Sequence, residues 1–319
     1  MNYLTRRLVT FPLVMLGVSV LVFISIRLVP GDAITAMLGT EAGLLTPGQR
    51  AALETYFGMD QSWFGQYWHW LGGALHGDLG ISVTYGKPVL DVILRVFPLT
   101  LELALLSMIV ALAIGLPAGI YAATHAERPS DLIVRVVAMI GQSTPSFVVA
   151  LLAIYALSVW FGVLPAMGTF TPLFEDPLKN LAQMILPALT LGFAFAAAVT
   201  RISRSAMLDI LSDDYVRTAR AKGVPQRKVI WHHALPNALI PVVTVSGVEF
   251  GYLLGGAVIV EQVFALPGLG RTVLDAILQR DYALVQGSVL FIALNFMIVN
   301  LLVDLAYAAL DPRIRLGAQ

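Results

Sequence analysis

Six long apolar segments constrain this chain more than any other feature of its sequence. They cover residues 8–29, 100–123, 146–164, 185–202, 238–262 and 284–309. Each is close to the roughly 20 residues that a helix needs to cross a bilayer. Because lipid cannot bond to backbone N–H and C=O groups, a segment that crosses it satisfies these groups as a helix. The sequence therefore predicts an all-α membrane protein with six transmembrane helices.

The composition supports a membrane protein and excludes several kinds of site. Hydrophobic residues make up 58% of the chain and charged residues 13%, whereas soluble domains have about 45–50% and about 25%. The net charge is zero, so no general basic field favours nucleic acid as a partner. The chain has no cysteine, which excludes disulfides, thiolate metal sites and a cysteine nucleophile.

The distribution of basic residues predicts the orientation in the membrane. If the N-terminus is inside, 13 of the 20 Lys and Arg residues fall in inner segments, seven of them between Arg201 and Lys228. Inner loops of membrane proteins carry such an excess of positive charge. We therefore expect both termini in the cytoplasm and a cytoplasmic loop at about 203–237.

A long outer loop is expected at about 30–98. Thr46 and Pro47 have the pattern of a helix N-cap and first turn, and Gly58 that of the helix end. Aromatic residues follow at spacings that place them along a second short helix. That helix either anchors the loop at the outer membrane interface or forms a platform for a ligand. The aromatic residues of that second helix are Trp63, Phe64, Tyr67, Trp68 and Trp70.

Between the last two spans, residues 266–282 predict a turn and a short amphipathic helix.

The sequence offers no motif for catalysis by this chain. Its one Gly-Lys pair, Gly86-Lys87, is followed by Pro88 and so lacks the pattern of a Walker loop. His232 and His233 are adjacent, so on a helix they point about 100° apart and do not share a metal. We expect no catalytic residue, no metal and no cofactor on this chain.

One acidic residue lies deep in a span. Glu249 lies eleven residues after the first residue of the fifth segment, about 16 Å along a helix and near the middle of the bilayer. A carboxyl group at that depth is costly when it faces lipid, so it should point into the bundle or toward water. Two interpretations stay open. Glu249 either contacts a cationic or amine-bearing solute in a translocation pathway, or it is a buried, hydrogen-bonded carboxyl.

The cytoplasmic loop has the pattern of two short helices joined at a glycine. Ser212, Asp213 and Asp214 supply an N-cap and first-turn acids, and Gly223 supplies the left-handed residue that ends the first helix. A second helix starts at Pro225, and we expect Leu235-Pro236 to break it. A loop that only fixes topology needs charge but no signals that start and end helices, so the pattern favours a docking element. Tyr215, Ala219 and Ala221 are expected to leave small or aromatic surface for a partner.

The same stretch resembles the loop signature of integral-membrane subunits of bacterial ABC importers. The resemblance lies in DYVRTARAKG, followed by Ile230, Ala234-Leu235-Pro236 and Asn237-Ala238. Along nearly the whole chain, stretches such as RLVPGD, HGDLGIS, GAVIVEQVF and RDYALVQG resemble the first permease subunit of the dipeptide, oligopeptide, glutathione and nickel family. Where relatives usually carry Arg and Gln, this chain has Pro236 and Glu249.

The resemblance implies a single permease domain over residues 1–319, with the type I importer fold, in the bacterial inner membrane. It implies three kinds of partner besides lipid: a homologous second permease subunit, two cytoplasmic ATPase subunits that hold ATP and Mg, and an external solute-binding protein. The loop helix is then the coupling helix that docks in the ATPase. The residues that match its motif are Tyr215, Arg217, Ala219, Arg220, Ala221, Lys222, Gly223 and Arg227.

We therefore expect one transmembrane half of an importer for peptides or a similar small solute, such as a dipeptide, an oligopeptide, glutathione or a nickel complex. An ion-coupled secondary transporter with Glu249 as its proton or cation site is the alternative. A receptor or scaffold that transports nothing is a third possibility.

Overall fold

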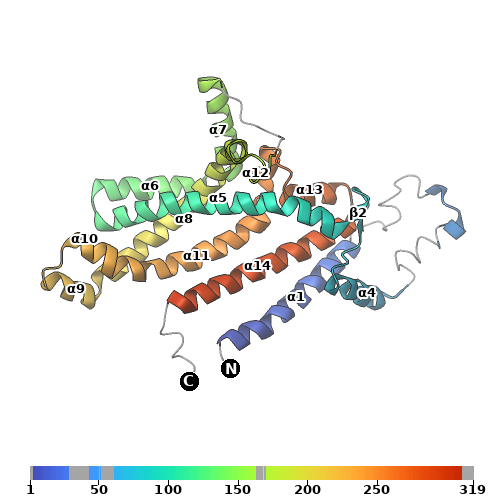
Figure 1. Ribbon diagram of the computed structural model, residues 1–319, viewed down its shortest axis with the longest axis horizontal. Helices are drawn as coiled ribbons and strands as arrows, with labels where there is room; N and C mark the ends of the chain where they lie inside the picture. The colour runs from blue at the N-terminus through green and yellow to red at the C-terminus, as the bar shows by residue number, and fades with distance from the viewer. Residues whose placement is uncertain are drawn as a thin grey trace. The chain divides into compact units, whose positions relative to one another are not determined.

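The computed structural model of the chain describes residues 3–28, 43–49, 51, 61–162, 168 and 170–310. The chain divides into two compact units, Met1–Leu99 with Gly268–Met297 and Thr100–Pro267 with Ile298–Gln319. Helices α5 (Val89–Thr124) and α14 (Tyr282–Leu310) pass from one unit into the other. Figure 1 shows the elements in order along the chain. That the whole chain acts as one permease domain stays a prediction.

The first unit also contains α1 (Tyr3–Arg27), α4 (Trp63–Leu75), α13 (Leu269–Leu278) and a small antiparallel hairpin of β1 (Ile81–Ser82) and β2 (Lys87–Pro88). The predicted amphipathic helix between the last two spans is therefore confirmed as α13. Helix α5 begins at Val89, inside the segment assigned to the outer loop, because Val89 and Ile93 pack fully buried against Leu269 and Leu284. Tertiary packing thus extends the helix beyond its apolar span.

The expected helix signals of the outer loop are present where the structure describes them. The backbone N–H of Gln49 donates to the Thr46 hydroxyl at 3.4 Å, and the Gln49 side chain accepts from the Thr46 N–H at 2.9 Å. These two bonds form a capping box, which confirms Thr46 as an N-cap. Gly58, the predicted end of that helix, lies outside the described residues. The second predicted helix of this loop, which carries the aromatic residues, is confirmed as α4.

Helix α4 is attached to the second half of α1. The Tyr67 hydroxyl lies 2.8 Å from the Ser19 hydroxyl, and Arg27 donates to the Gln66 side chain at 2.7 Å. Trp63 and Phe64, on another part of α4, are 60% and 73% exposed. One side of α4 therefore binds α1, while its exposed aromatic side chains fit either of the two predicted roles.

The second unit contains α6 (Pro129–Ser143), α7 (Ser146–Phe161), α8 (Pro177–Ser212), α9 (Asp214–Ala221), α10 (Gln226–Lys228), the π-helix η2 (Val229–Ala234), α11 (Leu235–Gly256) and α12 (Val258–Val263). Helices α5 and α8 cross at glycines. A Cβ built on Gly119 would lie 2.6 Å from the Thr200 carbonyl oxygen, and one on Gly192 would lie 2.7 Å from the Ser107 carbonyl oxygen. Small residues allow such close approach of helix backbones.

Five helices among the described residues are long and apolar enough to span a membrane, and a bent pair supplies a sixth span if its two helices count together. The segment predicted to span the membrane at 146–164 contains only α7, the second helix of the bent pair. Helix α7 has 16 residues, about 24 Å in length, and α6 meets it at an angle of 102°. Because Pro145 immediately precedes α7 and disfavours a helical conformation for the residue before it, α6 and α7 are separate helices with the bend between them.

Candidate functional site

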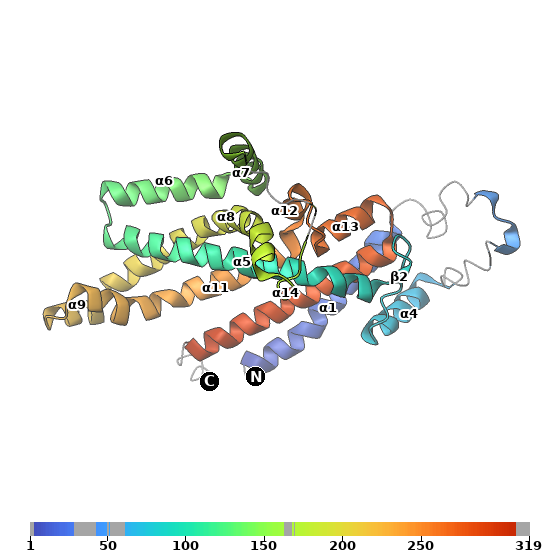
Figure 2. The same ribbon diagram turned by 45° about the horizontal axis from the view of Figure 1, so that its top comes forward.

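The predicted pair of short helices is present between α8 and α11 (Figure 2). We call residues 214–234, which comprise α9, a turn, α10 and η2, the elbow. The loop predicted at 203–237 is shorter than expected, because α8 continues to Ser212. The expected break at Leu235-Pro236 is wrong: η2 leads directly into α11 with Pro236 in its first turn. Proline is tolerated there because first-turn N–H groups have no partner within the helix.

Gly223 ends α9 as predicted. Its φ of +76° is left-handed. The Gly223 N–H donates to the Arg220 carbonyl at 2.9 Å, and the Val224 N–H donates to the Ala219 carbonyl at 3.2 Å. These two bonds form a Schellman motif, which satisfies carbonyls at the end of the helix. No described heavy atom lies within 4 Å of a Cβ built on Gly223, so the surface around it is open.

The start of α9 differs from the expected polar cap. Asp213 holds the N-cap position, but within the described residues its side chain makes no capping hydrogen bond. The Ser212 hydroxyl instead donates back to the Asp209 carbonyl at 2.7 Å. Asp214 lies in the first turn and pairs with Arg217 at 3.4 Å. The first turn thus keeps its favourable negative charge without the side-chain cap.

A small apolar core holds the elbow together. Val216 and Val229 are fully buried and Ala219 is 9% exposed, and the three pack against Ile210 and Leu211 of α8. The expectation that Ala219 offers surface to a partner is therefore wrong. It faces inward because it lies three residues after Val216, on the same side of α9. Ala221 is exposed, as expected.

Tyr215 connects α9 to the start of α11. Its hydroxyl donates to the His233 carbonyl at 3.2 Å and accepts from the Asn237 side chain at 2.8 Å. The ring remains 42% exposed, so it still offers aromatic surface. The contacts with His233 and Asn237 were missed, because no local sequence signal joins residues 18 and 22 positions apart.

The predicted basic residues are exposed on the elbow, but they do not all have the same environment. Arg220 donates to the Leu211 carbonyl at 3.3 Å, which ties its side chain back to α8. Lys222 and Arg227 are exposed, and Arg217 keeps 70% of its side chain exposed beside Asp214. The elbow therefore has positive charge on its surface and an apolar core of its own that holds its helices together.

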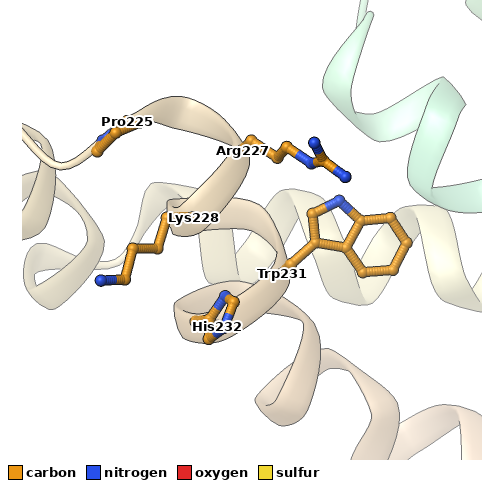
Figure 3. A pocket seen from close by; sticks show the side chains of 5 residues that line it. All are labelled: Pro225, Arg227, Lys228, Trp231 and His232. Carbon is orange, nitrogen blue, oxygen red and sulfur yellow. The ribbon is translucent and has the colours of Figure 1, made fainter.

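An open surface cavity of about 650 Å³ lies on the second half of the elbow. Arg227 and Trp231 point toward one another on one side of it, while Lys228 and His232 lie on the other (Figure 3). Trp231 is 53% exposed and was not singled out in the sequence. Its position four residues after Arg227 was an available signal, because such pairs share one helix face.

Glu249 lies apart from the elbow. It is half-buried in α11, 14 residues after the first residue of that helix and therefore about 21 Å along it. Two residues before it, Gly247 packs closely against the Val303 side chain of α14. The two interpretations of Glu249, pathway contact or buried carboxyl, both stay open. Among the described residues no cluster of His, Cys, Asp and Glu has the arrangement of a metal site.

The spans and the elbow together define a helical integral-membrane protein with a basic pair of short helices between two spans. Residues 115–316 match the family described as "Binding-protein-dependent transport system inner membrane component", and residues 1–104 match its N-terminal region. The chain belongs to this family, and it is a permease subunit of an ABC importer. As a permease subunit it is not itself catalytic, and it works within a transporter complex.

Relatives of known name support this assignment along the whole chain. The glutathione transport system permease protein GsiC of Escherichia coli is 41% identical over 315 residues, 99% of each chain. The protein of the same name from Shigella flexneri is 40% identical over the same length. The inward-facing MetNI methionine ABC transporter has the same fold, with a TM-score of 0.54 and 18% identity over 69% of this chain and 96% of that chain. These matches support the importer and not the ion-coupled secondary transporter.

Proposed function

We propose that the elbow is the surface through which partner ATPase subunits drive this permease. The observation that carries the proposal is the Schellman turn at Gly223, which satisfies the backbone of the elbow internally and leaves open surface around the glycine. A preformed surface loses little conformational entropy on binding. Five basic residues and one acidic residue between Asp214 and Lys228 favour an acidic groove on the partner.

The residues proposed for docking are those that combine exposure with the predicted motif. Arg217, Ala221, Lys222 and Arg227 offer side chains to the partner, and Tyr215 offers its ring. Ala219 contributes to the apolar core of the elbow, and the exposed Arg220 is held to α8 by its bond to the Leu211 carbonyl. ATP and Mg are held by the ATPase subunits, and this chain holds no cofactor.

We further propose that the transported solute is a peptide or a peptide-like compound such as glutathione. This proposal rests on the identity of 41% with the glutathione permease along 99% of both chains. Glu249 contributes a carboxylate to the pathway, where it attracts the amine of such a solute. A homologous second permease subunit completes the pathway, and an external solute-binding protein delivers the solute. Both termini face the cytoplasm of a bacterial cell.

Substitution of Gly223 tests the docking proposal. In Gly223→Glu, a bulky charge enters the open surface, so we expect normal membrane insertion but loss of ATPase co-purification and of transport. Gly223→Asn is the matched control, because Asn tolerates the left-handed conformation and adds no charge. Unchanged ATPase binding and transport in Gly223→Glu would contradict the docking role.

Reconstitution separates the importer from a solitary carrier. We expect the chain alone in liposomes to show no gradient-driven uptake, and the complete complex to require ATP. Solute uptake by this chain alone, driven by a proton or cation gradient, would contradict the need for ATPase partners. Direct binding measurements with the solute-binding protein identify the solute.

A further inference from the structure

A buried carboxylate holds α6 against α8. Asp131, in the first turn of α6, is fully buried. Arg204 of α8 donates to both of its oxygens, from Nε to Oδ1 at 2.7 Å and from Nη2 to Oδ2 at 2.8 Å. Two parallel bonds of this kind fix the relative orientation of the groups as well as their distance. A buried ion pair often adds little to stability, because removing both charges from water is costly. We therefore assign the geometry of this pair to orienting α6 against α8.

The same carboxylate also holds the turn that precedes α6. The Glu127 N–H donates to Asp131 Oδ2 at 3.1 Å, and Glu127 has a left-handed φ of +65°. Arg135 adds a second cation at 3.5 Å from Oδ1. The turn between α5 and α6, the first turn of α6, and α8 therefore meet at one side chain.

A second contact prevents α6 from pivoting about this ion pair. Ten residues after Asp131, a Cβ built on Gly141 would lie 3.2 Å from the Phe193 ring and 3.4 Å from the Ala197 side chain of α8. The interval corresponds to about 15 Å along α6. A helix held at two points so far apart follows its neighbour as a rigid body.

Helix α8 connects this assembly directly to the elbow. Arg204 lies eight residues before the end of α8 at Ser212, about 12 Å along the helix. In the last turns of α8, Ile210 and Leu211 pack against the core of the elbow, and the Leu211 carbonyl accepts from Arg220. A displacement of the elbow therefore reaches Arg204 without crossing a flexible joint.

We propose that Asp131 and Arg204 are positioning residues that make α6 and the α5–α6 turn move with the elbow and α8 during the transport cycle. The pair thereby passes movement of the elbow into α6, which forms a bent pair with α7. This role rests on the proposed docking of ATPase subunits at the elbow. It adds a residue pair that touches neither the ATPase nor the solute.

The first test measures transport per ATP hydrolysed in the complete importer, reconstituted with its ATPase, second permease and solute-binding protein. In Asp131→Asn we expect the complex to assemble and to hydrolyse ATP, while solute moved per ATP falls at least about threefold. Arg204→Lys keeps the charge but loses the planar fork, so it should show the same defect. The exchange of the two residues, Asp131→Arg with Arg204→Asp, rebuilds the ion pair but not the bond to the Glu127 N–H or the pair with Arg135, so it should restore part of the ratio. Asp275→Asn, which removes the half-buried pair of Arg271 and Asp275 within α13, is the control and should change nothing.

A distance measurement gives a readout other than activity. The chain has no cysteine, so spin labels at Met139→Cys in α6 and Asp209→Cys in α8, both exposed positions, report one distance only. We expect the same narrow distance distribution with and without ATP, and a broader one when Asp131→Asn is added.

Each outcome decides between this role and its competitors. If the distance between the two spin labels changes during the cycle while Asp131 and Arg204 are both present, the rigid connection is overturned. A normal amount of solute moved per ATP in Asp131→Asn would overturn it as well. If Asp131→Asn does not assemble, Arg204→Lys and the exchange variant decide: an assembled exchange variant with no recovery overturns the proposal. Loss of ATPase binding in Asp131→Asn would assign the pair to docking instead. Failure of the docking proposal is seen separately, in unchanged ATPase binding by Gly223→Glu.

Discussion

The Asn237 side chain donates a 2.8 Å hydrogen bond to the Tyr215 hydroxyl, across 22 residues of chain. This bond joins α9 to the first turn of α11, which continues into a membrane span. The Tyr215 hydroxyl also donates to the His233 carbonyl. One phenol group therefore closes the elbow, so that α9 cannot move away from η2 and α11 without breaking both bonds.

Removal of this hydroxyl should loosen the elbow while its aromatic surface is kept. For Tyr215→Phe we expect a loss of about 1 kcal/mol per hydrogen bond and a lower midpoint of thermal unfolding in detergent. Transport by the reconstituted complex should fall severalfold. Tyr155→Phe, which alters a 60% exposed ring on α7, is the control. If Tyr215→Phe and Asn237→Ala act independently in the double variant, the bond does not connect them as described.

The glycine crossing of α5 and α8 should tolerate no side chain. A Cβ at Gly119 would lie 2.6 Å from both the Thr200 carbonyl and the Ser203 side chain, so Gly119→Ala should destabilise the protein by about 1–3 kcal/mol. Gly17→Ala in α1 is matched to it, because no described atom lies within 4 Å of that Cβ. Thermal unfolding of both purified variants measures the difference. Equal midpoints would show that the helices separate easily.

Glu249→Gln tests the proposed pathway contact with almost no change of shape. If the carboxylate attracts the amine of a solute, neutralisation should weaken uptake of amine-bearing peptides relative to N-acetylated ones by about threefold or more, equivalent to about 0.7 kcal/mol. Competition between the two kinds of peptide in reconstituted complexes measures this ratio. Unchanged transport, selectivity and pH dependence would leave Glu249 as a structural carboxyl.

Asp281 should be essential to the β1–β2 hairpin of the first unit. Fully buried, it accepts from the Ser82 hydroxyl at 2.5 Å, the Thr84 N–H at 3.0 Å and the Leu284 N–H at 3.2 Å. Asp281→Ala leaves three donors without an acceptor, so we expect a loss of about 2–3 kcal/mol.

Limited proteolysis within the hairpin measures the local effect of Asp281→Ala. Asp78→Ala is the comparison, because Asp78 accepts one exposed bond from the Gly80 N–H. Cleavage should be much faster in Asp281→Ala than in Asp78→Ala. Equal cleavage of both variants would contradict the anchoring role of Asp281.

The sequence alone determined those features that depend on local chemistry. Apolar length predicted the five spans that are single long helices, since a helix that crosses lipid needs about 20 apolar residues. Gly223 was predicted to end α9, because its backbone conformation depends on the absence of a Cβ rather than on distant contacts. The resemblance to importer permeases was equally readable, because its motifs are contiguous in the sequence.

Only the tertiary structure decided which side chains face inward and which residues far apart in the sequence meet. Ala219 matched an exposed motif position but packs against Val216 and Val229. Helix α5 starts at Val89 because Leu269 and Leu284 cover that turn. The pair of Asp131 and Arg204 spans 73 positions, and no periodicity links residues that far apart. Burial and pairing depend on the packing of several helices together, and that packing is absent from any single stretch of sequence.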